Sequence, residues 1–216
     1  MPIDGKVIAR LKQALATSDD HVAPGPRLVD DATRLYRRII HFTEMKLVAE
    51  GIDLDAVELA CYAIELPCRS TRASATARGG RSGIRDRSEE AAELLLGLAL
   101  DVDDALLDRT ARILHEMPHR QPMLDEARLL ADALNLDDFG IIGLLNQAMT
   151  SSIAGDGLLQ LADGLQKREI YGYWEARLKD GFHFEPVRLL ARRRLDNYRH
   201  VALLLSTELK EDGSVG

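Results

Sequence analysis

Four polar side chains gather near the end of a leucine-rich stretch, residues 126 to 140, with the sequence EARLLADALNLDDFG. Three are carboxylates and one is an amide: Asp132, Asn135, Asp137 and Asp138. Oxygen atoms of these types are the ligands that Mg²⁺, Mn²⁺ and Ca²⁺ prefer. The leucines of the stretch recur at helical spacing, so two interpretations are open. It is either a helix that carries carboxylates into a metal site or an amphipathic helix with a solvated polar face.

Three further side chains are candidate partners of Asp132 in a metal site: Asp31, Glu65 and His115. Together the four would form a mostly carboxylate site for a divalent ion. Each also has an ordinary structural explanation. A half-buried Glu65 would pair with an arginine, Asp31 lies near a predicted helix start, and His115 lies near a predicted helix end, where a positive charge is favoured.

Arginine and glycine dominate residues 68–88, CRSTRASATARGGRSGIRDRS, which hold six arginines. Few large apolar groups occur there, so the sequence predicts a loop, and a loop of this length is usually functional or disordered. Guanidinium groups bind phosphate through paired hydrogen bonds. The predicted phosphate-binding residues are Arg69, Arg72, Arg78 and Arg81. The alternative is a solvated insertion without a ligand.

The composition is that of a globular protein with its own apolar core, at 216 residues, 46% hydrophobic and 29% charged. The net charge of -7 argues against a nucleic-acid partner. No apolar run approaches the ~20 residues that span a bilayer, and the N-terminus lacks the apolar core of a secretory signal. We therefore expect a cytoplasmic protein without a membrane partner, in which Cys61 and Cys68 are reduced.

Helical periodicity covers most of the chain, and no long stretch alternates with period two. Helices are predicted at residues 4–16, 28–50, 54–66, 89–100, 105–117, 126–140, 139–149, 158–180 and 185–209. A kink is expected in the eighth, at Gly164 or Gly172. The prediction is an all-α protein with an N-terminal helix and loop at 1–27 and a single helical domain at 28–210.

Several local phrases resemble the HD superfamily of metal-dependent phosphohydrolases. The phrases are DDATRLYRRII at 30–40, EGIDLDAVELACYAIEL at 50–66, EARLLADALNLDDFG at 126–140 and ARRRLDNYR at 191–199. The resemblance implies a helical fold in which an early histidine, a His-Asp doublet and a later aspartate hold one or two divalent metals. Such metals activate a water that attacks a phosphate ester.

Most of the metal-ligand positions implied by this resemblance are substituted. The early histidine falls at Asp31, or at His21 or His41 if the loop before the long helix is aligned differently. In every register the doublet falls at Glu65 and Leu66, and the later aspartate falls at Leu134. Leucine cannot coordinate a divalent ion, and no His-Asp pair occurs anywhere in the sequence.

Three hypotheses follow. The first is a degenerate HD-like protein that binds a phosphorylated small molecule, a nucleotide or a protein partner and needs no cofactor. The second is a working phosphohydrolase that holds Mn²⁺, Mg²⁺ or Fe²⁺ through Asp31, Glu65, His115 and Asp132. The third is a structural protein that forms a homodimer, for which the aromatic residues Tyr171, Tyr173 and Trp174 are either core or dimer contacts.

Overall fold

The computed structural model describes residues 3–16, 26–47, 50–69 and 80–213. This part of the chain contains ten α-helices, two short 3-10 helices and no strand, which confirms the predicted all-α class. The chain divides into two compact units, residues 1–131 and 132–216. Within the described ranges, no helix is long and apolar enough to cross a membrane.

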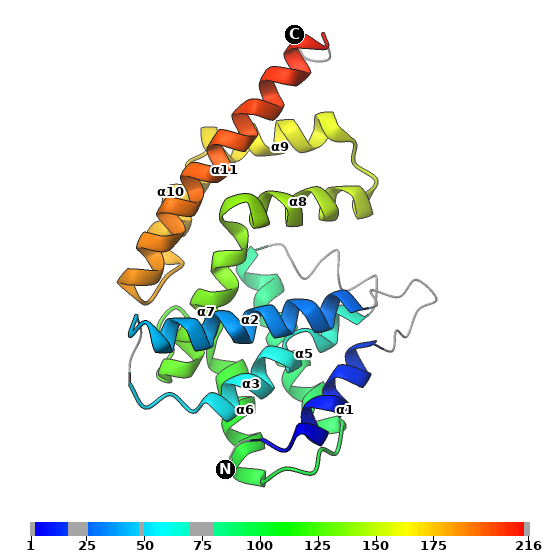
Figure 1. The fold of residues 1–216 in the computed structure, drawn as a ribbon, viewed down its shortest axis with the longest axis vertical. Helices are drawn as coiled ribbons and strands as arrows, with labels where there is room; N and C mark the ends of the chain where they lie inside the picture. The colour runs from blue at the N-terminus through cyan, green and yellow to red at the C-terminus, as the bar shows by residue number, and fades with distance from the viewer. Residues whose placement is uncertain (1–2, 17–25, 48–49, 70–79, 214–216) are drawn as a thin grey trace. The chain divides into compact units, whose positions relative to one another are not determined.

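The first unit is built around one buried helix, α3 (Figure 1). Its elements are α1 (Gly5–Ala16), α2 (Pro26–Glu44), α3 (Leu54–Ala63), the 3-10 helix η1 (Leu66–Arg69), α5 (Gly80–Gly97), α6 (Asp104–Glu116) and most of α7 (Asp125–Asn135). Seven of the ten residues of α3 are buried, and α1, α2, α5 and α6 all contact it. A helix that is apolar on nearly every side belongs in a core, and here it positions the elements around it.

The second unit packs three helices against the long C-terminal helix. After the last turn of α7 come the 3-10 helix η2 (Leu136–Asp138), α8 (Gly140–Ala154), α9 (Leu158–Ile170), α10 (Tyr173–Asp180) and α11 (Glu185–Glu211). Helix α11 contacts α8, α9 and α10, while α8 and α9 lie beside each other (Figure 1).

Aromatic rings fill the core of the second unit. The ring centroid of Trp174 lies 5.2 Å from that of Phe139 and 4.6 Å from that of Tyr198, and Phe139 lies 5.4 Å from Phe182. Trp174 is fully buried, so of the two roles considered for it, this structure gives it the core role. Tilted and edge-on pairs at these separations are favourable beyond the area they bury.

Two predicted helices end earlier than expected, each at a residue with positive φ. Helix α2 ends at Glu44 because Lys46 takes a left-handed φ of 52°, and Leu47 N–H then donates to the carbonyl of Phe42 at 3.0 Å. This is the hydrogen-bond pattern of a Schellman motif, with lysine where glycine is usual. The predicted helix 158–180 is two helices, α9 and α10, separated at Gly172 with φ 63°.

The predicted loop at 68–88 is wrong over part of its length. Residues 66–69 form η1, and residues 80–88 belong to α5, which continues to Gly97; residues 70–79 lie outside the described residues. The many arginines and glycines and the few large apolar residues favoured the loop prediction, but Arg85 and Glu89 form an i,i+4 ion pair of 3.2 Å that supports a helix. The buried Ala91, Ala92 and Leu95 then fix α5 on the first unit.

Candidate functional site

Glu65 lies just after α3, at the position where the resemblance places the metal-binding doublet. Its side chain is buried and forms an ion pair of 2.7 Å with the guanidinium of Arg87 from α5. The Nε–H of Arg87 also donates to the carbonyl oxygen of Ile64 at 2.7 Å. The arginine therefore contacts both the carboxylate and the neighbouring backbone oxygen at this position.

Asp31 lies on α2, where the resemblance places the early histidine. Its carboxylate forms an ion pair of 3.1 Å with Arg34, one turn further along the same helix, and its side chain is 25% exposed. A carboxylate held by an i,i+3 arginine is a common helix-surface arrangement. Asp31 and Glu65 are thus both paired with arginines of the first unit.

His115 projects from the last turn of α6 and is exposed. A histidine in this position interacts favourably with the negative end of the helix dipole. Its neighbour Glu116 accepts hydrogen bonds from the backbone N–H groups of Met123 at 2.7 Å and Leu124 at 2.8 Å. Glu116 therefore fixes the turn between α6 and α7.

Asp132 is fully buried in the second unit, and its carboxylate accepts hydrogen bonds from the backbone that precedes α11. Its Oδ1 accepts from the N–H of His183 at 2.8 Å, and its Oδ2 accepts from the N–H of Phe184 at 2.9 Å. Burial raises the pKa of Asp132 to about 7, although the two backbone donors and the charge of Arg188 act in the opposite direction. Both oxygens are engaged in positioning the start of α11.

The four candidate ligands therefore form no visible metal centre. In the part of the chain that the structure describes, no group of three or more His, Cys, Asp or Glu side chains is placed to hold a metal ion. Asp31, Glu65 and His115 belong to the first unit and Asp132 to the second. Leucine lies at the two remaining positions that the resemblance assigns to ligands, Leu66 and Leu134.

The predicted phosphate-binding arginines are placed only in part. Arg72 and Arg78 lie outside the described residues, while the backbone of Arg69 ends η1 and that of Arg81 lies in the first turn of α5. The two helices η1 and α5 contact each other. Phosphate binding by the four arginines stays a prediction.

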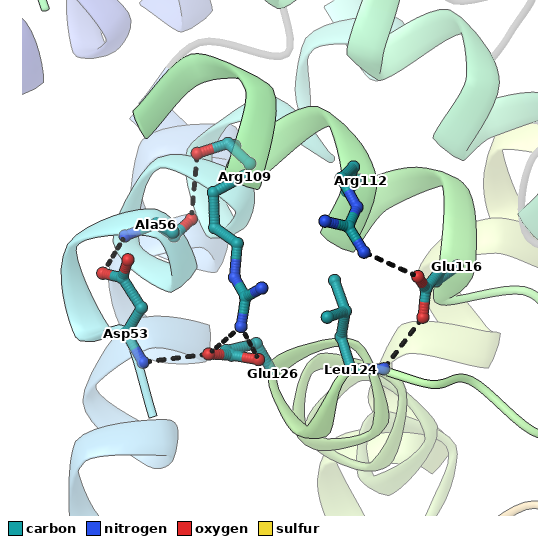
Figure 2. A network of polar contacts seen from close by, with 8 residues as sticks. Asp53, Ala56, Arg109, Arg112, Glu116, Leu124 and Glu126 are labelled. Carbon is teal, nitrogen blue, oxygen red and sulfur yellow. Dashed lines mark hydrogen bonds and ion pairs between the residues drawn. The ribbon is translucent and has the colours of Figure 1, made fainter. Parts of the chain in front are cut away.

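A buried polar network that sequence reasoning missed centres on Glu126 (Figure 2). Its two carboxylate oxygens accept from one nitrogen of Arg109 at 2.9 and 3.0 Å, and one of them also accepts from the backbone N–H of Asp53 at 3.1 Å. Asp53 in turn caps α3 by accepting from Ala56 N–H at 3.1 Å. The network joins α3, α6 and α7, and the only signal in the sequence was an acidic residue in the first turn of α7.

The electrostatics of this network favour the charged form of Glu126. Burial by itself raises the pKa of a carboxyl group, but the hydrogen bonds from Arg109 and from Asp53 N–H outweigh it and lower the pKa of Glu126. Arg109 and Glu126 therefore form a structural ion pair, and both carboxylate oxygens accept hydrogen bonds from within the protein.

A second pair that the sequence did not reveal joins α2 and α3. Tyr36 and Glu58 share a side-chain hydrogen bond, and burial raises the pKa of Tyr36 to about 12 and also raises that of Glu58. Close to it, the hydroxyls of Thr33 and Tyr62 lie 3.2 Å apart. These contacts hold α2 against the central helix of the first unit.

The fold is similar to that of a known bacterial protein, although the sequence is not. No protein-family model matches the chain, and no curated protein is significantly similar to it in sequence. A crystal structure of Bacillus subtilis YpgQ in complex with ADP matches with a TM-score of 0.60 and 19% identity, over 94% of this chain and 97% of YpgQ. Another crystal structure of YpgQ matches with a TM-score of 0.57 and 17% identity over the same shares. At this identity the likeness to YpgQ shows the fold alone.

Proposed function

We propose that this protein binds a phosphorylated small molecule, with a nucleotide as the first class to test, on an HD-like helical scaffold. The observation that carries the proposal is the likeness to YpgQ, which was crystallised with ADP and matches over 94% of this chain. Arginines cluster where the chain leaves the buried helix α3, and guanidinium groups are well suited to phosphate oxygens.

The proposal further holds that the ligand is bound without hydrolysis at a His-Asp metal pair. Glu65 and Leu66 occupy the positions of that pair, and Glu65 is already paired with Arg87. A hydrolase built from Asp31, Glu65, His115 and Asp132 remains the competing hypothesis, and it requires carboxylates that are engaged elsewhere in the described structure.

Calorimetric titration with ADP, ATP and inorganic pyrophosphate tests the proposal directly. We expect a nucleotide to bind, and replacement of Arg72 and Arg78 by alanine to weaken binding by about 10- to 100-fold, the effect of losing one or two charge-assisted hydrogen bonds. Arg112→Ala, on the exposed side of α6, is the matched control and should bind as the parent does. No binding of any of the three compounds would reject the proposal.

The same samples distinguish the competing hydrolase. Release of phosphate from the bound nucleotide in the presence of Mn²⁺, abolished by Glu65→Gln, would support a rebuilt metal site and contradict binding without hydrolysis. Unchanged nucleotide after prolonged incubation with Mn²⁺ is the result we expect.

A second candidate function, binding of a protein partner or a second copy, is favoured by the surface of α8. Ile141, Leu145 and Met149 recur every four residues along α8 and are 50%, 55% and 42% exposed. A continuous apolar row on a helix is typical of an interaction surface. Light scattering of the parent and of Leu145→Glu tests self-association, with Leu203→Glu on α11 as the control.

A further inference from the structure

The contact between Glu65 and Arg87 is a buried ion pair. The side chain of Arg87 is 12% exposed and that of Glu65 is 8% exposed, at a separation of 2.7 Å. The pair joins the turn after α3 to a residue of α5 that is 22 positions further along the chain. It contrasts with the Arg85–Glu89 pair two residues away, whose side chains are 62% and 52% exposed.

The oxygens that Arg87 contacts are of the type that a hard divalent cation also seeks. One is a carboxylate oxygen of Glu65 and the other is the backbone carbonyl oxygen of Ile64, at 2.7 Å from Nε. A guanidinium group is permanently charged, and here its Nε–H donates to the carbonyl of Ile64 while its Nη2 forms the ion pair with the Glu65 carboxylate.

A carboxylate paired with an arginine also lies at the position that the resemblance assigns to the early histidine. Asp31 stands there, and its carboxylate is paired with Arg34 at 3.1 Å. Both acidic residues at positions that the resemblance assigns to metal ligands are therefore neutralised by arginines of the first unit.

We infer that Arg87 is the resident cation at this position, where the guanidinium has taken over the charge-neutralising role of a metal ion. The residues present do not fit the implied metal, because leucine fills two ligand positions and the one buried carboxylate of the doublet already has its counter-charge. The buried charge of Glu65 is thus neutralised by a side chain of the first unit and not by a bound metal ion. The inference rests on the HD-like scaffold of the proposed function and not on its nucleotide.

The inference is tested by thermal unfolding of the full chain in EDTA and in Mn²⁺. We expect the melting temperature of the parent to be the same in both, and Arg87→Met to lower it by about 10 °C by leaving a buried carboxylate uncompensated. Arg85→Ala, in the exposed pair of the same helix, should change it by about 1 °C or less.

If Arg87→Met does not fold, the double variant Glu65→Leu/Arg87→Met still tests the inference, because it removes both partners of the ion pair. Removing both charges together leaves no buried charge uncompensated, and only the carbonyl of Ile64 loses a donor. We therefore expect the melting temperature of the double variant to regain most of the loss and to be unaffected by Mn²⁺. Two results would overturn the inference: a parent melting temperature that falls in EDTA, or a double variant no more stable than Arg87→Met. Failure of nucleotide binding would leave both measurements unaffected.

Discussion

At the scale of single residues, Glu126 is a buried carboxylate whose three hydrogen bonds come from two other elements (Figure 2). Glu126→Ala would leave the guanidinium of Arg109 and the N–H of Asp53 without this acceptor. We expect the free energy of unfolding to fall by about 3 kcal/mol. Urea denaturation measures this change, with Arg112→Ala as the control, because the side chain of Arg112 is 62% exposed and its ion pair with Glu116 is long, at 3.8 Å.

The same residue makes a prediction about acid stability. Since the pKa of Glu126 is lower in the folded state than in the unfolded chain, its contribution is present above the unfolded pKa and is lost as the pH falls through the folded pKa. The difference in stability between the parent and Glu126→Gln should therefore shrink as the pH falls from about 6 to about 3. A difference that stays constant with pH would contradict the lowered pKa.

The contribution of Asp132 to stability depends on pH in the opposite direction. Burial raises its folded pKa to about 7, so its favourable contribution is complete below the unfolded pKa and is lost as the pH rises toward 7. Relative to Asp132→Asn, the parent should lose stability with rising pH by up to about 1.4 kcal/mol per pH unit in the range from about 4 to 7. The carboxyl carbon resonance of Asp132 measured by NMR checks the midpoint, and a midpoint near 4 would be inconsistent with this effect of burial.

At the scale of the elements, Gly172 decides where one helix ends and the next begins. Its φ of 63° is strained for any side chain, whereas Gly164 lies inside α9, where an added Cβ would meet Gln147 at an ordinary 3.7 Å. Gly172→Ala should lower the free energy of unfolding by about 1 kcal/mol, and Gly164→Ala should raise it by up to about 1 kcal/mol. Chemical denaturation of both variants gives the comparison, and equal effects would contradict the assigned helix boundary.

At the scale of the whole molecule, the boundary between the two units falls inside α7, between Ala131 and Asp132. Because one continuous helix belongs to both units, we expect them to unfold in a single transition. Trp174 is the only tryptophan and is buried in the second unit, so its fluorescence reports on that unit while far-UV circular dichroism reports on both. Denaturation curves from the two probes should coincide, and separated midpoints would show independent unfolding.

The sequence by itself determined the helical class and the position of most helices. Leucines and alanines at intervals of three and four are a local signal, and they predicted α3, α6 and α11 close to their observed places. The start of α3 after Asp53 could also be anticipated, because aspartate is a favoured N-cap residue. At Gly172 only a kink was expected, whereas the chain separates there into two helices. The early end of α2 at Lys46 could not, because lysine carries no such signal.

Only the tertiary structure decided what each charged side chain does. Local sequence made Asp132 and Glu65 equal candidates for a metal site, but one carboxylate holds the start of α11 and the other is paired with Arg87. Nothing in the local sequence distinguished Glu126. Its carboxylate nevertheless accepts hydrogen bonds from Arg109 and from the backbone of Asp53, which lie 17 and 73 positions away in the chain. The pairing of residues so far apart in the sequence depends on tertiary packing. A buried carboxylate is costly unless the fold brings hydrogen-bond donors or an opposite charge next to it, and local sequence does not contain that information.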